Sequence, residues 1–324
     1  MPDNIEPDTQ TQPERSNLDP SKFIDRVAEQ ELFGSLLQFK DDARLLTIKD
    51  RTGRGKSALM RRLEYNCKWT LQVPVALILL DQLDDATDFG MISAVHAALA
   101  NDLTFKTFAP LNLALAQRKE TVFGNLARAT PVQGSIEMEG ASVTGQNNTF
   151  AGKVTNVNSQ TAIINAPGPA TFTPAEELLA RRNCMEAFLA DLKDICQETP
   201  IVVLLDAWDR CRSSELQRWI RDTLLRVHCF DLKRRPSKLV FVLAGCDMPG
   251  FKETLGDERY HNLVKSISSL GDWDESHVAQ FLELNGFCGV GNDEVKLICE
   301  KLKGGLSLLN ALIAIRYMRL PSTA

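Results

Sequence analysis

One short stretch, IKDRTGRGKSALMRRLEYN at residues 48–66, points to the fold of this 324-residue chain. It places Gly55-Lys56-Ser57 directly after an apolar run and before a segment with helical spacing. A glycine-rich turn between a buried strand and a helix directs backbone N–H groups and the positive end of the helix dipole toward one point. The stretch therefore predicts a loop that binds nucleotide phosphates, although Asp50 stands where the usual pattern G-x-x-x-x-G-K-[ST] has its first glycine.

Each residue type in this loop has a chemical task. Glycine allows the backbone to approach the phosphates closely, and Lys56 is expected to neutralise the charge of the β- and γ-phosphates. The hydroxyl oxygen of Ser57 is expected to bind Mg²⁺. The predicted nucleotide-binding residues of the loop are Gly53, Arg54, Gly55, Lys56, Ser57 and Ala58.

A second motif, IVVLLD at residues 201–206, supports the first. Its apolar run ends in Asp206, which places a carboxylate at the carboxyl end of a buried strand. Ligands of open α/β sheets bind at that edge, so Asp206 is expected to hold Mg²⁺ through water while the loop holds the phosphates. The alternative is that Asp206 only caps its strand.

The remaining pattern predicts an α/β fold. Apolar runs of strand length alternate with segments of helical spacing, which is typical of a parallel sheet covered on both faces. We therefore expect a three-layer P-loop NTPase fold with a parallel sheet, a β-ribbon insertion and a C-terminal helical lid. The predicted strands are 43–50, 73–81, 201–206, 238–247 and a weaker one at 263–270.

The chain is expected to divide into four parts. Residues 1–20 are polar and predict a disordered tail, and 21–270 form the P-loop domain. Within that domain, 132–173 has alternating apolar residues and glycine or asparagine turns, which predicts β-hairpins or a ribbon. A disordered polar loop is the alternative for this insertion. After residue 270 the strands stop, so 271–324 is expected to be a helical lid.

Composition limits the class of protein. The apolar content of 44%, the charged content of 24% and the net charge of −5 are those of a soluble globular protein. The acidic balance predicts that nucleic acid is not the primary ligand. The eight cysteines follow no C-x-x-C pattern, which indicates reduced core residues in a cytoplasmic protein. No apolar stretch reaches the ~20 residues that span a bilayer, so no membrane is expected.

Several motifs also follow one another in the order of a known family. Together they resemble the signal-transduction P-loop ATPases with numerous domains, the STAND class related to NACHT, NB-ARC and AAA+ proteins. The similarity covers about 23–318 except the insertion. The motifs are FIDR at 23–26 followed by Glu29 and Leu32, the Walker A loop at 50–57, Walker B at 204–209, the sensor strand at 238–251, the lid approach at 266–282, and the lid motif GGLSLL at 304–309.

The resemblance implies ATP and Mg²⁺ as cofactors and assigns further roles. Arg26 would contact the nucleotide base or phosphate. Ala207 stands where many relatives have a catalytic acid, so Asp209, three residues after Asp206, is the candidate catalytic acid together with Asp206. The turn Gly245-Cys246-Asp247 lacks the family's Ser-Arg pair. These departures predict an ATPase that turns over slowly.

Three hypotheses for the function follow. The first is an ATP-binding, slowly hydrolysing STAND-type switch whose nucleotide state controls oligomerisation and signalling in defence, with a homo-oligomer or an effector protein as partner. The second is a degenerate P-loop module that scaffolds partners without turnover. The third is an AAA+-like ATPase that remodels nucleic acid. The basic cluster at 233–235 would suit the third, but a solvated loop is the favoured interpretation.

Overall fold

The structure, a computed structural model, divides the chain into two compact units. One comprises Met1–Thr104 with Leu192–Ala324, and the other Phe105–Asp191. The predictions for the 1–20 tail and the 304–309 motif lie outside the described residues. The structure describes residues 23, 26–117, 136–138, 141–143, 173–284 and 290–303.

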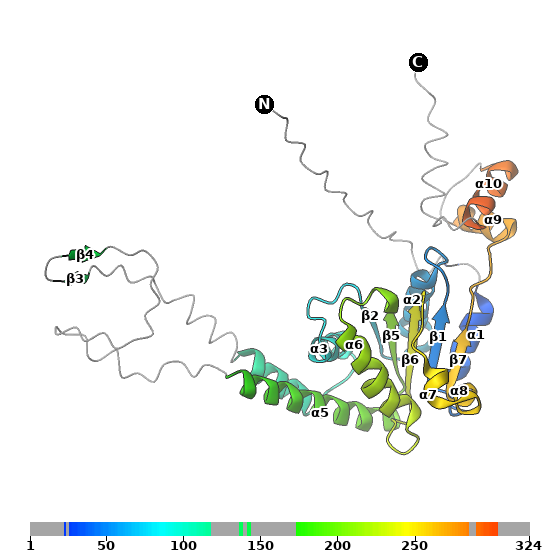
Figure 1. Ribbon diagram of the computed structural model, residues 1–324. Helices are drawn as coiled ribbons and strands as arrows, with labels where there is room; N and C mark the ends of the chain where they lie inside the picture. Colours follow the sequence, from blue (N-terminus) through cyan, green and yellow to red (C-terminus); the bar gives the residue numbers. More distant parts are fainter. Residues whose placement is uncertain are drawn as a thin grey trace, which may run out of the picture. The chain divides into compact units, whose positions relative to one another are not determined.

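The first unit contains a five-stranded parallel sheet in the order β2-β5-β6-β1-β7 (Figure 1). This confirms the predicted α/β fold. Because all strands run the same way, their carboxyl ends share one edge, and β6 separates the strand before the phosphate loop from the strand that ends in Asp206. The strands are β1 (Leu45–Lys49), β2 (Val75–Leu79), β5 (Ile201–Asp206), β6 (Leu239–Gly245) and β7 (Val264–Ile267).

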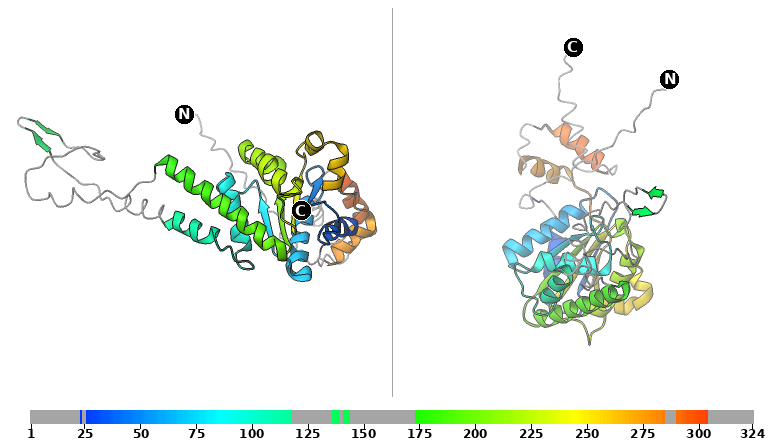
Figure 2. Two further views of the ribbon diagram at one scale, coloured as in Figure 1. Left: turned by 90° about the horizontal axis from the view of Figure 1, so that it is seen from below. Right: turned by 90° about the vertical axis from the view of Figure 1, so that its left-hand side faces the viewer.

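Helices lie on both faces of the sheet (Figures 1 and 2). The sequence pattern missed α7 and α8, which have 5 and 7 residues and are too short to show a helical period. The helices are α1 (Val27–Leu36), α2 (Lys56–Tyr65) continued by the π-helix η2 (Asn66–Leu71), α3 (Asp88–Leu99), α6 (Ser214–Trp219) continued by the π-helix η4 (Ile220–Phe230), α7 (Phe251–Leu255), α8 (Asp257–Leu263), α9 (Glu275–Leu284) and α10 (Asn292–Lys303).

The core follows from the two-residue period of the strands. Val242 of β6 is the register partner of Leu46 in β1 and of Leu204 in β5, so the three side chains form one row across the sheet. Phe33 of α1 and Leu63 of α2 pack onto this face, and all five side chains are at most 2% exposed. Burial of these apolar rows holds the carboxyl ends of the strands in register.

The second unit contains the beginning of α5 (Pro174–Glu198) and a helix at 108–117. The start of α5 has a capping box, because Thr173 Oγ1 accepts the Glu176 N–H at 3.2 Å and the Glu176 carboxylate accepts the Thr173 N–H at 2.9 Å. In the insertion, β3 (Ile136–Met138) and β4 (Ala141–Val143) pair antiparallel, as a ribbon requires. The rest of the insertion lies outside the described residues.

A second, smaller core joins α9 and α10. Val278 and Leu282 of α9 pack with Val295 and Ile298 of α10, and Trp273 packs against them from the segment before α9. The part of the predicted lid beyond α10 lies outside the described residues. None of the described helices is long and apolar enough to cross a membrane.

Candidate nucleotide-binding site

The loop between β1 and α2 has the backbone of a phosphate cradle. Gly53 and Gly55 have φ values of 85° and 92°, which glycine adopts without strain. Gly55 caps α2, whose first intrahelical bond runs from Leu59 N–H to Gly55 O at 2.9 Å. The N–H groups at the start of α2, at Lys56, Ser57 and Ala58, therefore have no partner inside the helix and lie at its positive end.

Lys56 lies across this loop. Its ammonium group donates to the carbonyl oxygens of Asp50 at 2.6 Å and Arg51 at 2.9 Å, and to Cys246 Sγ at 3.4 Å. These acceptors are neutral groups, whereas phosphate oxygens are charged and form stronger, charge-assisted hydrogen bonds. The Lys56 ammonium group can therefore give up its hydrogen bonds to the loop and form stronger ones to a bound phosphate.

Asp50, the unusual residue at the start of the loop, is directed toward the end of β7. Its carboxylate accepts the Leu270 N–H at 2.7 Å and the Arg51 N–H at 2.6 Å, and the residue is 8% exposed. Both oxygens are thus compensated by backbone donors. The acid at this position supports the loop and is not presented to a ligand.

Asp206, the predicted magnesium ligand, is 2% exposed at the end of β5. One carboxylate oxygen accepts the Ala207 N–H at 2.7 Å. The other is buried and has no hydrogen-bond partner among the residues that the structure describes. Burying a charged oxygen without a partner costs folding free energy, so a ligand that pairs with this oxygen would recover that cost.

The donor set fits Mg²⁺. Within the described ranges no three His, Cys, Asp or Glu side chains gather to hold a metal ion. Mg²⁺ does not need such a cage, because it keeps several waters and binds one or two carboxylates together with nucleotide phosphates. Asp206 and the hydroxyl of Ser57, on a helix that packs against β5, provide that partial set.

The turn after Asp206 directs Asp209 to the neighbouring strand. Ala207 has the left-handed conformation (φ 61°), and the chain then forms the short helix η3 (Trp208–Arg210). Asp209 Oδ1 accepts the Cys246 N–H at 2.6 Å, which ties the end of β5 to the end of β6. Gly245 allows this approach, since a Cβ there would lie 2.9 Å from Asp209 Oδ1.

Cys246 is a site residue that the sequence did not reveal. Its Sγ lies 3.2 Å from Thr52 Oγ1 and 3.4 Å from Lys56 Nζ, so the thiol sits on the phosphate loop. The family pattern places a sensor here, and the structure places a thiol in contact with the loop lysine. Only the position of β6 between β1 and β5 brings this cysteine to the loop.

Arg26 and Arg54, both predicted to bind nucleotide, contact the segment between β7 and α9. We call residues 268–274 the connector. Arg26 is 6% exposed and donates to Gly271 O at 2.7 Å, and Arg54 forms an ion pair with Asp272. Their roles toward a nucleotide stay predictions, as do those of the other loop residues.

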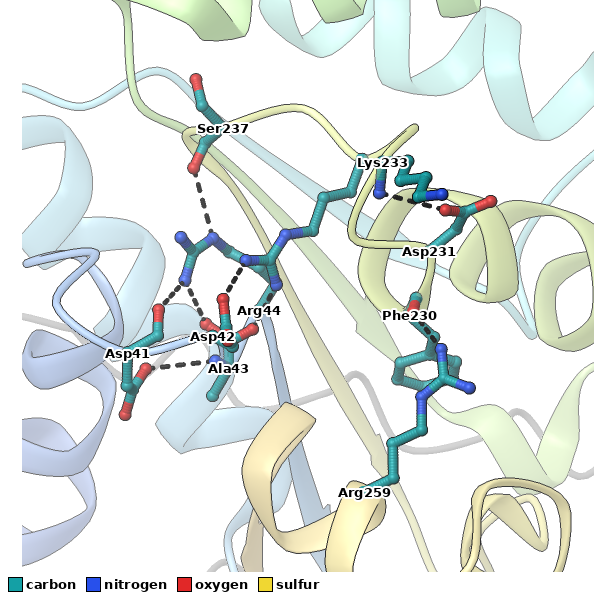
Figure 3. Close-up of polar contacts among 10 residues, drawn as sticks. Asp41, Asp42, Ala43, Arg44, Phe230, Asp231, Lys233, Ser237 and Arg259 are labelled. Carbon is teal, nitrogen blue, oxygen red and sulfur yellow. Dashed lines mark hydrogen bonds and ion pairs between the residues drawn. The ribbon is translucent and has the colours of Figure 1, made fainter.

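The basic cluster at 233–235 lies before β6 and contacts the segment before β1, so it is at the amino ends of these strands, away from the loop that follows β1. Figure 3 shows Lys233 of this cluster beside Asp231. Arg235 bonds to the backbone and carboxylate of Asp42. Arg234 lies 3.7 Å from the Asp231 carboxylate and is exposed. These contacts agree with a surface loop whose arginines pair with nearby aspartates, Arg235 with Asp42 and Arg234 with Asp231.

The fold is shared with a solved structure of an ORC2 protein, and structures of a CDC6 and an ORC1 protein also match. An Aeropyrum pernix ORC2 protein, in ADPNP–ADP complexes, is 14% identical with a TM-score of 0.50; the match covers 93% of this chain and 64% of that one. CDC6P from Pyrobaculum aerophilum is 13% identical (TM-score 0.40; 87% and 58% covered), and Aeropyrum pernix ORC1 in complex with DNA is 14% identical (0.39; 91% and 62%). No model of a protein family and no curated protein matches the sequence.

These comparisons revise the sequence-based predictions. The α/β fold is shared with the ORC2 structure and is consistent with a P-loop NTPase fold. The narrower STAND or NACHT class, with signalling and defence, is not supported. The prediction that nucleic acid is not a primary ligand is contradicted, because it rested on the acidic balance of the whole chain alone. The net charge averages over the whole surface and excludes no local DNA contact. The chain spans 64% of the length of the ORC2 chain.

Proposed function

We propose that this protein is an AAA+-related ATPase that binds Mg²⁺-ATP and hydrolyses it slowly. The observation that carries the proposal is the unpaired, buried carboxylate oxygen of Asp206 at the same edge of the sheet as the phosphate loop. A parallel sheet offers this edge to ligands. An unpaired buried charge there lowers the stability of the nucleotide-free protein, which favours a binding function over a structural one.

The chain's residues divide the work of binding. The backbone from Gly53 to Ser57 receives the phosphates, and Lys56 exchanges its loop carbonyls for phosphate oxygens. Ser57 and Asp206 hold Mg²⁺, which neutralises charge on the phosphates when bound. Lys56 is held only by hydrogen bonds to neutral acceptors, and one oxygen of Asp206 has no hydrogen-bond partner among the described residues, so both groups are available to a ligand.

Slow hydrolysis follows from the acids near the site. Ala207 has no group that orients water, and the Asp209 carboxylate is engaged by the Cys246 N–H. A general base must be within hydrogen-bond reach of the attacking water, so Asp209 has to share its carboxylate between bracing β6 and orienting water. We therefore propose that the Asp209 carboxylate is the general base of a slow reaction in which the bound nucleotide sets the state of the protein.

We propose a nucleic-acid remodelling ATPase as the more specific form of this function. The likeness to the ORC2 protein, whose solved structure contains ADPNP and ADP, supports the nucleotide part of this proposal. A STAND-type signalling switch has only the order of the sequence motifs in its favour. We propose DNA as the macromolecule on which the nucleotide state acts.

The test uses the purified full chain. Fluorescent ATP and ADP analogues are titrated with and without Mg²⁺, phosphate release is measured, and labelled single-stranded and duplex DNA are titrated at two salt concentrations with ADPNP or ADP. Tight Mg²⁺-dependent nucleotide binding and DNA affinity that differs between the nucleotides support the proposal. Absence of nucleotide binding overturns it and favours the scaffold module. Nucleotide binding without DNA binding overturns the DNA assignment alone.

A further inference from the structure

The connector is held by three successive contacts from the nucleotide site. Its residues 270, 271 and 272 each bond to a side chain from the phosphate loop or from the turn before α1. The contacts are Leu270 N–H to Asp50 Oδ2 at 2.7 Å, Arg26 Nη2 to Gly271 O at 2.7 Å, and the Arg54–Asp272 ion pair.

The connector joins two separate cores. Leu270 is 1% exposed and belongs to the core of the sheet. Trp273 packs on Phe281 of α9 at a ring-centroid distance of 5.4 Å and belongs to the core of α9 and α10. Any change between residues 270 and 273 therefore changes how the helix pair is tethered to the sheet.

The two outer contacts differ in burial. The Asp50–Leu270 bond is buried between residues that are 8% and 1% exposed. In the Arg54–Asp272 pair, the arginine side chain is 12% exposed and the aspartate side chain 47%. An ion pair with a half-exposed partner contributes little free energy, so the second contact opens more readily than the first.

A bound phosphate would compete with Asp272 for the guanidinium group of Arg54. Its Nε is buried and has no hydrogen-bond partner within the part of the chain that the structure describes. A guanidinium group binds phosphate through two parallel N–H bonds, and a phosphate carries more charge than one carboxylate. A phosphate in the loop can satisfy the unused Nε and compete with Asp272 for the rest of the group.

We propose that the Arg54–Asp272 ion pair is a nucleotide-sensitive latch on the connector and that the Asp50–Leu270 bond is its fixed pivot. Without nucleotide the latch is closed. Phosphate in the loop draws Arg54 away, releases Asp272, and frees α9 and α10 to move about Leu270. This inference rests on the proposed nucleotide binding, and it makes Asp50 a positioning residue.

Hydrogen exchange of the full chain tests the latch, with and without Mg²⁺-ADPNP at a concentration that a separate titration shows to be saturating. The nucleotide should raise exchange in peptides covering 272–284 several-fold and leave the Leu270 amide unchanged. Asp272→Asn should show the raised exchange without nucleotide, lose the response, and bind nucleotide about two- to fivefold more tightly because competition is removed.

Asp41→Asn is the matched control. Asp41 also has a 47% exposed side chain and pairs with Lys265 at 3.0 Å, but it lies at the amino ends of the strands. The Asp41→Asn variant should have the nucleotide affinity and the connector hydrogen exchange of the wild type. Saturating nucleotide without a change in connector exchange overturns the latch and leaves the proposed function standing. An Asp272→Asn variant with wild-type affinity and exchange also overturns it, whereas absence of nucleotide binding overturns the function itself.

Discussion

The carboxylate of Asp50 accepts the backbone N–H of Leu270 at 2.7 Å, although the two residues are 220 positions apart. They meet because β1 and β7 are neighbours in the sheet, so the loop after β1 and the connector after β7 begin side by side. The bond makes the first residue of the phosphate loop part of the attachment of α9. The candidate nucleotide site and the helix pair are therefore connected by one buried contact.

Replacing Lys56 removes the charge that meets the phosphates. Lys56→Ala should weaken ATP binding by about 10- to 100-fold, the value of charge-assisted hydrogen bonds, without loss of the fold. Fluorescent nucleotide titration measures the affinity and circular dichroism the fold. Lys68→Ala is the control, because Lys68 lies in η2 and pairs with Glu64 at the surface. Equal affinities for the two variants would exclude Lys56 from the site.

Asp206→Asn separates metal binding from stability. The variant should lose the Mg²⁺-dependent increase in nucleotide affinity while keeping metal-free binding. Because it replaces an unpaired buried charge by a neutral group, its melting temperature without nucleotide should be equal to or above that of the wild type. Titration at several Mg²⁺ concentrations and calorimetry measure both effects. A full Mg²⁺ response in the variant would refute the role of Asp206.

Gly245 has no room for a side chain. In Gly245→Ala the new Cβ would lie 2.9 Å from Asp209 Oδ1 and 3.0 Å from Trp208 Cβ. We expect a loss of about 1–3 kcal/mol in the free energy of unfolding, measured by denaturant titration. In Gly34→Ala, by contrast, nothing lies within 4 Å, and the helical position should gain about 0.5–1 kcal/mol. The prediction fails if both variants are equally stable.

Nucleotide should protect Cys246 from alkylation. Its Sγ lies 3.4 Å from Lys56 Nζ. A phosphate bound in the loop therefore covers the thiol or displaces Lys56 from it. Peptide mass spectrometry after timed iodoacetamide treatment should show slower labelling of Cys246 with Mg²⁺-ATP. Cys211, which is also partly exposed and bonds to Ser213 O, serves as the internal control and should react at the same rate in both conditions. Unprotected Cys246 under saturating nucleotide contradicts the placement of the phosphates.

His228 should make the protein sensitive to acid. Burial, with a smaller effect of Lys193, lowers the pKa of His228 from 6.5 to about 4. Between these values the unfolded chain binds a proton that the folded protein does not. Stability is therefore retained above pH 6.5 and falls as the pH is lowered to 4, by about 3 kcal/mol.

Denaturant titrations from pH 7 to pH 4 measure this loss. The variant His228→Leu should lose about that much less stability over the same range than the wild type. The exposed His261 of α8 provides the control variant His261→Gln. Parallel pH curves for the wild type and His228→Leu would show that the imidazole is not kept neutral by the fold.

The sequence predicted those parts of the fold that depend on local pattern. Runs such as IVVLLD at 201–206 are buried on both faces, and the composition of a doubly covered strand is visible without knowledge of its neighbours. The turn after β1 was also visible in the sequence, because Gly53 and Gly55 allow the positive φ values that the structure shows. The short helices α7 and α8 were missed, because each buries few side chains and shows no period.

The contacts among site residues could not be predicted. Cys246 reaches the loop because β6 lies between β1 and β5, and strand order is set by packing of the whole sheet. The acidic net charge gave a wrong exclusion of nucleic acid, since a sum over all side chains does not describe any one surface.

By itself, the sequence determined a parallel α/β sheet, a glycine-rich loop at residues 50–57 of the kind that binds phosphates, and an acid at the end of a second buried strand. These features depend on local sequence alone, on the apolar runs of the strands and on the conformational freedom of Gly53 and Gly55. Only the tertiary structure decided where Asp50 points, that Asp209 is bound by Cys246, and that Arg54 meets Asp272. Those pairs lie far apart in the chain, and the order of the strands alone brings them within hydrogen-bonding distance.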